Sequence, residues 1–195
     1  MKKLSLASLI IGAIFFSACN GNPNSGSTQS NNTLIDKSKA ISSSSDTARM
    51  ALVSDDAKDF SKEVAQNCMM EEQLGSIAVK NGGTERIKDF GKMMVVNYTK
   101  ISDDLKYLAS KKNVVLPTSN SDDQQQNIDK LSKEIGKKFD EDYVSMMITD
   151  YKANIATFKK AENNISDIGY KSFISNALPI LQNDLDAIEA IKKEM

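Results

Sequence analysis

Residues 87–101 read Ile87-Lys88-Asp89-Phe90-Gly91-Lys92-Met93-Met94-Val95-Val96-Asn97-Tyr98-Thr99-Lys100-Ile101. Apolar side chains recur here three or four residues apart, which is the period of an α-helix with one buried face. The same face continues through Leu105 and Leu108. Tyr98 stands on this face where the pattern calls for an aliphatic residue. The sequence therefore predicts a phenol near the middle of a long amphipathic helix.

Three further segments carry the same helical period. Their inward positions are Phe60, Val64, Asn67 or Cys68, Glu71, Leu74 and Ala78 in the first; Val144, Met147 or Ile148, Tyr151, Ile155 and Phe158 in the third; and Phe173, Ala177, Leu181, Asp184, Ile188 and Ile191 in the fourth. No segment alternates polar and apolar residues as a half-buried strand does. We expect an all-α bundle of four main helices over residues 54–195.

The predicted helix ends carry capping signals. Ser54 and Thr84 stand where the first two helices begin, because their hydroxyls can accept hydrogen bonds from the first turn. Asp55 and Asp56 follow Ser54, in a turn where the helix dipole favours negative charge. The first helix is expected to stop at the Asn-Gly-Gly sequence of residues 81–83.

Two features interrupt the simple pattern. Residues 113–122 predict a loop between the second and third main helices, followed by a short helix that buries Ile128, Leu131 and Ile135. Pro179 falls inside the fourth helical segment, which the sequence places from about residue 166. A proline there either kinks the helix axis or marks a new helix start.

The N-terminus has the three parts of a secretory signal. A basic start, Met1-Lys2-Lys3, precedes an apolar run over residues 4–16 and then the small residues Ser17 and Ala18. A membrane-spanning helix needs about 20 consecutive apolar residues, so this run is short for spanning. We expect residues 1–18 to be a signal peptide that is removed.

The end of this segment, Phe16-Ser17-Ala18-Cys19, resembles a bacterial lipobox, in which the cysteine is lipidated and becomes the first mature residue. Cys19 would then attach the protein to a membrane, because each buried CH₂ of an acyl chain contributes about 0.8 kcal/mol. The alternative is an ordinary signal peptide whose Cys19 merely lies near the cleavage point.

Residues 19–53 are expected to connect the lipid to the helical domain. Residues 20–33 contain no aliphatic or aromatic side chain, so they cannot bury enough surface to order themselves. Residues 34–53 have a weak apolar pattern and predict a partial helix at most. The sequence thus predicts a flexible tether.

Charge argues against one class of partner. Without residues 1–18 the chain has 23 basic and 26 acidic side chains, and lysines alternate with acids along it. Nucleic-acid binding calls for a clustered basic surface. We therefore expect no nucleic-acid partner and interpret the lysines as a solvated surface.

Each main helix has one conspicuous polar residue in its apolar row: Glu71, Tyr98, Tyr151 and Asp184. A buried carboxylate without partners is costly, whereas tyrosine hydroxyls can donate hydrogen bonds to carboxylates. The four residues are therefore candidates for a polar centre in which the tyrosines donate to the acids. The alternative places each at the edge of its apolar row, with the phenols reaching water and the acids exposed.

Several short motifs follow one another in a distinctive order. They are Met69-Met70-Glu71-Glu72-Gln73-Leu74-Gly75, Ile87-Lys88-Asp89-Phe90-Gly91-Lys92-Met93-Met94, Asn97-Tyr98-Thr99-Lys100, Leu108-Ala109, Leu116-Pro117, Phe139-Asp140, Tyr143, Asp150-Tyr151 and Leu178-Pro179-Ile180-Leu181. With them, residues 55–192 or so resemble the bacterial ferritin-like family called domain of unknown function 4142. The resemblance implies a ferritin-like four-helix bundle, here with an extra short helix between the second and third helices. It also implies an exported or outer-membrane protein.

The chain departs from the family pattern where chemistry would reside. Typical members have histidines at the positions of Tyr98, Tyr151 and Asp184, and a glutamate at the position of Gln73, while Glu71 is retained. A ferritin-like di-iron site needs four carboxylates and Glu-x-x-His pairs, and this chain has no histidine. We therefore assign no metal site and no cofactor. A carboxylate-and-water site for Mg²⁺ or Ca²⁺ stays open, although two acids are few.

Other reactive side chains have simpler explanations. Cys68 lies on an apolar helix face with no histidine to activate it, which predicts a buried small hydrophobe. The methionine pairs at residues 69–70, 93–94 and 146–147 fit core filling, with soft-metal binding as the alternative. No nucleophile elbow or phosphate-binding glycine loop is found. We expect no enzyme.

The sequence thus favours a lipid-anchored, non-enzymatic helical domain of the bacterial cell envelope, at the outer membrane facing the periplasm, acting in envelope interaction or stress adaptation. The alternative is a binding protein that holds a cation or small polar ligand at the Glu71, Tyr98, Tyr151 and Asp184 centre. The membrane, reached through the lipid on Cys19, is the one partner that the sequence indicates. It identifies no protein or small-ligand partner.

Overall fold

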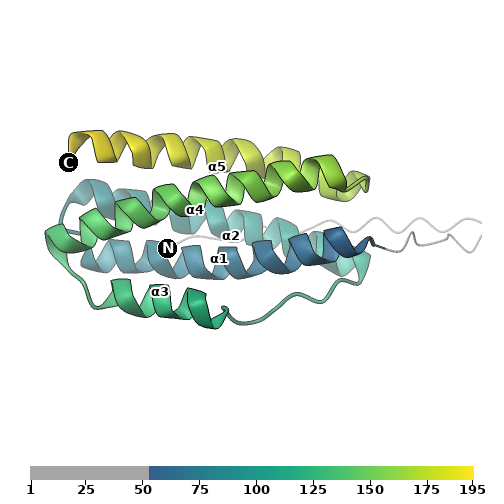
Figure 1. The fold of residues 1–195 in the computed structure, drawn as a ribbon, viewed down its shortest axis with the longest axis horizontal. Helices are drawn as coiled ribbons and strands as arrows, with labels where there is room; N and C mark the ends of the chain where they lie inside the picture. Colours follow the sequence, from purple (N-terminus) through teal and green to yellow (C-terminus); the bar gives the residue numbers. More distant parts are fainter. Residues whose placement is uncertain (1–52) are drawn as a thin grey trace, which may run out of the picture. The chain divides into compact units, whose positions relative to one another are not determined.

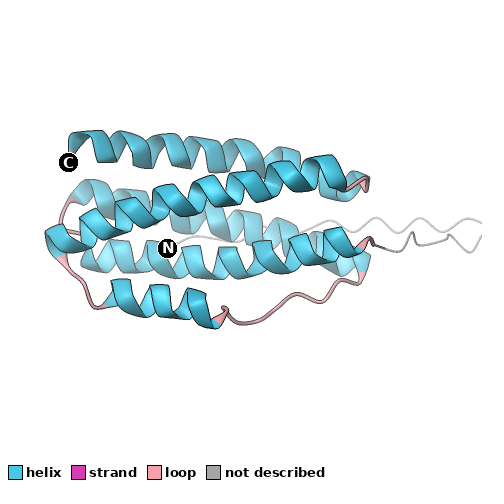
Figure 2. Cartoon of the chain, in the orientation of Figure 1, coloured by secondary structure: helices cyan, strands magenta, loops and turns pink. Residues whose placement is uncertain are grey.

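The computed structural model describes residues 53–195, so the predicted signal peptide, Cys19 and the tether up to residue 52 lie outside the described residues. Four long helices, α1 (Asp55–Asn81), α2 (Glu85–Lys112), α4 (Gly136–Asn164) and α5 (Ile168–Glu194), lie side by side, and the shorter α3 (Asp122–Ser132) packs along α1 (Figure 1). This part of the chain contains no strand (Figure 2). The prediction of an all-helical bundle is confirmed.

The first two helices begin where the capping signals predict. The Ser54 hydroxyl accepts a hydrogen bond from the backbone N–H of Ala57, and the Thr84 hydroxyl accepts one from that of Ile87. Each hydroxyl satisfies a backbone donor that the first turn of a helix leaves unpaired. None of the helices in residues 53–195 has the length and apolar content that membrane crossing requires.

The structure corrects the prediction for Ile135. Its side chain is 75% exposed, because α3 ends at Ser132 and Ile135 adopts an extended conformation directly before α4. The Asn81 side chain donates to the backbone carbonyls of Ser132 at 3.1 Å and Glu134 at 2.8 Å. These carbonyls therefore bond to α1 instead of continuing α3, and the helical spacing no longer applies at Ile135.

Helix α5 starts slightly later than the predicted position near residue 166, and its interior decides between the two alternatives for Pro179. The helix begins at Ile168, because the Asp167 carboxylate caps it by accepting hydrogen bonds from the backbone N–H groups of Gly169 and Tyr170. It then continues through Pro179 as one helix. The alternative of a new helix start at the proline is wrong.

The four long helices form two hairpins. The most extensive interfaces join α1 to α2 and α4 to α5, and these hairpins meet through smaller α1–α4 and α2–α5 interfaces. We call the α1–α4 and α2–α5 interfaces together the seam. The seam is the place where polar side chains of one hairpin can meet those of the other.

Two glycines allow α1 and α2 to approach closely. A Cβ atom added to Gly75 would lie 2.8 Å from the carbonyl oxygen of Gly91, and one added to Gly91 would lie 2.6 Å from that of Gly75. Real side chains do not make carbon–oxygen contacts this short. The absence of a side chain at both positions therefore sets the packing distance within the first hairpin.

Aromatic rings fill the core on both sides of the middle of the bundle. Toward the start of α1, Phe60 packs edge-on against Phe158 with ring centroids 5.1 Å apart. Toward the start of α4, Phe139 stacks on Tyr143 at 5.2 Å and Phe90 approaches the same tyrosine at 6.2 Å. These apolar clusters leave the polar residues of the core in the middle.

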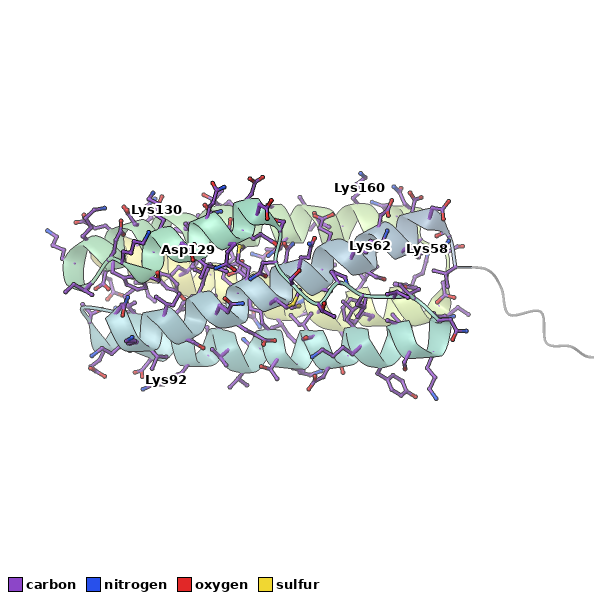
Figure 3. The ribbon with its side chains drawn as sticks, turned by 90° about the horizontal axis from the view of Figure 1, so that it is seen from below. Lys58, Lys62, Lys92, Asp129, Lys130 and Lys160 are labelled. Carbon is purple, nitrogen blue, oxygen red and sulfur yellow. The ribbon has the colours of Figure 1, made fainter. Side chains whose placement is uncertain are left out.

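The lysines shown in Figure 3 lie on the outside of the bundle. Figure 3 shows Lys58, Lys62, Lys92 and Lys160 with their side chains pointing away from the bundle. The first three pair with an aspartate three residues earlier on the same helix. Exposed pairs of this kind contribute about 0–1 kcal/mol each, so the core and not the surface charge holds the bundle together.

Gly75→Ala tests the close approach of α1 and α2. The added methyl meets a backbone oxygen that cannot rotate away, so we expect a cost near the upper end of the roughly 1–3 kcal/mol of overpacking. This exceeds the ~1 kcal/mol that alanine gains over glycine in a helix. Urea unfolding measures the difference, with the exposed Ser76→Ala as control. A Gly75→Ala variant as stable as the parent would contradict the packing argument.

Candidate functional site

The four residues predicted as a polar centre all lie in the middle of the core. Glu71 on α1 and Tyr151 on α4 are 0% exposed, and Tyr98 on α2 and Asp184 on α5 are 2% exposed. The alternative in which they reach water at the edges of their apolar rows is wrong. The Tyr98 and Tyr151 rings are 5.9 Å apart, centroid to centroid.

Asp184 receives hydrogen bonds from two helices. The Tyr151 hydroxyl donates to Oδ2 at 3.2 Å, and the Asn97 amide lies 2.8 Å from Oδ1 and 3.0 Å from Oδ2. Burial raises the pKa of Asp184, while the hydrogen bonds from Asn97 and Tyr151 lower it in part. Tyr151 thus takes the donor role expected toward Asp184. Asn97 was missed, although it stands directly before Tyr98.

Tyr98 is held by a chain of amides. Asn154 donates to the Tyr98 hydroxyl at 3.2 Å and accepts from Asn67 at 2.6 Å, and Asn67 accepts from Gln124 at 3.0 Å. Gln124 also belongs to the capping box that starts α3, together with Ser121. The chain therefore links the short outer helix to a tyrosine in the core. Burial, and next the charge of Glu71, raise the pKa of Tyr98.

Glu71 has no hydrogen-bond partner among residues 53–195. Both of its carboxyl oxygens are enclosed and unpaired, although the side chain is fully buried. The expectation that a tyrosine satisfies Glu71 is wrong, because Tyr98 bonds to Asn154 and Tyr151 bonds to Asp184. Burial raises the pKa of Glu71 well above its ordinary value, and the charge of Asp150 raises it further. The carboxyl group therefore favours its neutral, protonated form.

Asp150 is a second acid of the centre that the sequence analysis did not select. It stands directly before Tyr151 on α4 and is half-buried, and its enclosed oxygen Oδ2 has no hydrogen-bond partner in the part of the chain that the structure describes. Burial raises the pKa of Asp150 to about 6. No basic side chain of the described residues lowers the pKa of Glu71 or Asp150. The two acids therefore lack a compensating positive charge.

A third tyrosine lines the same region. The Tyr143 hydroxyl donates to the Met94 sulfur at 3.2 Å, a weak acceptor, and its ring stacks on Phe139. Burial raises the pKa of Tyr143, and the charges of Glu71 and Asp184 add to this. Tyr143 appeared in the sequence motifs, but no pattern there placed it at the centre.

The arrangement offers donors and acids but no activated nucleophile. Cys68 lies one turn before Glu71 and is 1% exposed, and burial raises the pKa of its thiol far above the ordinary range. As predicted, it packs as a small buried side chain. Within residues 53–195 no group of three or more histidine, cysteine, aspartate or glutamate side chains is arranged to hold a metal ion.

These features define a class of protein: a helical bundle with a buried polar layer and two acids that no positive charge compensates. The family model described as domain of unknown function (DUF4142) matches residues 42–191, and the chain belongs to this family. Neither the curated proteins nor the solved structures gave a match to the chain.

Tyr151→Phe tests the bond to Asp184. A buried carboxylate that loses a donor is left partly unpaired, so the free energy of unfolding at neutral pH should fall by about 1–3 kcal/mol. Because the pKa of Asp184 is raised, the loss should shrink at acidic pH, where the acid is protonated. Urea unfolding at both pH values measures this. Tyr143→Phe, which loses only a bond to sulfur, is the control. A larger loss of unfolding free energy in Tyr143→Phe than in Tyr151→Phe would contradict the bond between Tyr151 and Asp184.

Proposed function

We propose that the protein is a lipid-anchored, non-enzymatic, ferritin-like helical domain of the bacterial cell envelope. Its anchor is the lipid on Cys19, and its place is the outer membrane, facing the periplasm. The lipobox-like sequence Phe16-Ser17-Ala18-Cys19 is the observation that carries the anchor. The chain belongs to a family whose members are expected to be exported or outer-membrane proteins, and this expectation supports the location.

The chain connection supports the ferritin-like part of the proposal. Lys112, the last residue of α2, pairs with Asp167 just before α5, whereas Gly136, the first residue of α4, pairs with Gly82 just after α1. The connection from α2 to α4 therefore runs from one end of the bundle to the other, with α3 along its path. One long crossover between two antiparallel hairpins is the ferritin-like topology.

The hydrogen bonds of the centre support a non-enzymatic role. At the three positions where typical family members have histidines, Tyr151 and Asp184 bond to each other and Tyr98 bonds to Asn154. Groups held in this way stabilise the core and are not free to exchange protons with a substrate. We therefore propose a role in envelope interaction or stress adaptation, in which the folded surface acts and the centre maintains the fold.

Cys19→Ser tests the anchor. The variant should lose fatty-acid labelling and, once its signal peptide is cleaved, leave the membrane fraction, because the acyl chains supply the hydrophobic attachment. Metabolic labelling with fractionation of intact cells measures both effects. Cys68→Ser is the matched control and should keep label and location. A cleaved, unlabelled Cys19→Ser protein that stays in the membrane would contradict the proposal.

One observation favours a second function, the binding of a cation or small polar ligand at the centre. Both oxygens of Glu71 and one oxygen of Asp150 are enclosed without partners among the described residues, and such atoms often mark the place of an ion or water. Elemental analysis of protein purified from its native membrane tests this function. Stoichiometric metal in the parent that is lost in Glu71→Gln would support it, and a metal-free parent would count against metal binding.

A further inference from the structure

Glu71 and Asp150 lie on opposite sides of the seam. Glu71 belongs to α1 in the first hairpin, and Asp150 belongs to α4 in the second. The charge of Asp150 raises the pKa of Glu71, but no hydrogen bond joins the two acids. Their interaction is therefore electrostatic, and its strength depends on how many of the two carboxyl groups are ionised.

The groups around Glu71 cannot offset a negative charge. The titratable groups that interact with its charge are Cys68 on α1, Tyr98 on α2, and Tyr143, Asp150 and Tyr151 on α4. Each of these becomes negative on losing a proton. Lys106 on α2 acts on Cys68 and Glu72 but does not lower the pKa of Glu71. Loss of a proton therefore leaves an uncompensated charge in the core.

The amide groups that bond across the seam do not titrate. Asn67 and Asn154 join α1 to α4 through amides, and Asn97 joins α2 to Asp184 on α5. An amide keeps its donors and acceptors at every pH that the fold tolerates. These bonds hold the hairpins in register, whereas the acid pair changes its charge.

We propose that Glu71 and Asp150 form a proton-binding pair that makes the seam responsive to pH. With both acids neutral, the two hairpins pack without electrostatic cost. As protons are released, like charges appear on both sides of the α1–α4 interface and favour its opening. This inference does not depend on the lipid anchor, and it competes with metal binding for the same two carboxyl groups.

The direction of the response follows from linkage. The ordinary pKa values are 4.5 for Glu71 and 3.8 for Asp150, and the folded protein raises both. The protonated forms of the two acids therefore contribute their full stabilisation when the pH is below the ordinary pKa values. This stabilisation is lost as the pH rises through the pKa values of the folded protein. For Asp150 the window extends from 3.8 to about 6, and for Glu71 it begins at 4.5 and ends well above that value.

Labelling of Cys68 can report the opening of the seam. The thiol is 1% exposed and lies one turn before Glu71, so a thiol reagent reaches it when α1 separates from its neighbours. The full-length protein and its Glu71→Gln variant are labelled side by side over a range of pH. Modification of Cys68 is quantified by peptide mass mapping, which separates it from Cys19. At any one pH, the intrinsic reactivity of the thiol is the same in both proteins. The ratio of the parent labelling rate to the variant labelling rate is therefore independent of that reactivity.

We expect the parent-to-Glu71→Gln ratio to be constant at acidic pH and to rise as pH increases. The rise should approach about tenfold per pH unit for one released proton where the seam opens reversibly. Asp150→Asn should give a similar rise between pH 3.8 and about 6. At neutral pH, the double variant should slow Cys68 labelling by less than the two single substitutions would if their effects on the free energy of opening were added. The reason is that each single substitution already removes the repulsion between the two charges.

Three results decide the proposal. Glu72→Gln, which removes a less buried charge one residue along α1, should leave the ratio nearly flat with pH. A ratio for Glu71→Gln that is equally flat would overturn the proposal and leave Glu71 a purely structural role. Protection of the parent, but not of Glu71→Gln, by Mg²⁺ or Mn²⁺ at neutral pH would also overturn it, since a metal would then occupy the site. If Glu71→Gln does not fold, Asp150→Asn decides alone.

Discussion

The need to satisfy polar atoms away from water governs the middle of this bundle. Apolar and aromatic side chains pack on both sides of that layer, so every donor and acceptor inside it must find a partner within the protein. Asp184 finds two donors and Tyr98 finds one. Each of these bonds crosses from one helix to another, and the bonds therefore fix how the helices are rotated about their axes. Glu71 and one oxygen of Asp150 are the exceptions in this layer, and the neutral form of each acid lowers the cost of leaving these oxygens unpaired.

The contacts within the first hairpin differ in kind from the contacts between the two hairpins. Within the first hairpin, the contact at Gly75 and Gly91 brings the backbones together, and packing alone sets the distance. Across the seam, amides such as those of Asn67, Asn97 and Asn154 supply directional bonds. Directional bonds specify one arrangement of the hairpins more strictly than apolar contacts do, and they tolerate misplacement less.

Helical periodicity predicted the four long helices and the burial of Glu71, Tyr98, Tyr151 and Asp184, because each residue falls on the face that its apolar neighbours define. The same argument missed Asn97 and Asp150. Successive residues in a helix point about 100° apart, so a residue beside a predicted one reaches the centre or the solvent according to the rotation of its helix. That rotation is set by tertiary packing, which a single sequence does not display.

Other failures have a similar origin. Ile135 was predicted to be buried because it continues the spacing of Ile128 and Leu131, but the Asn81 side chain takes up the carbonyls at the end of α3. The pairing of one tyrosine with each acid was also a reasonable expectation from chemistry. The actual partners depend on how the helices are placed: the Tyr98 hydroxyl accepts from Asn154, and Asp184 accepts from Asn97 as well as from Tyr151.

The crossover from α2 to α4 leaves the start of α1 and the end of α5 at opposite ends of the bundle (Figure 1). A helix rises 1.5 Å per residue, so α1, with 27 residues, carries the chain about 40 Å from its first turn to its last. The turn between α1 and α2 and the C-terminal residue Met195 therefore lie far from the point where the preceding residues join the bundle. Within the described residues, this end is therefore separated from residue 53 by the full length of the bundle.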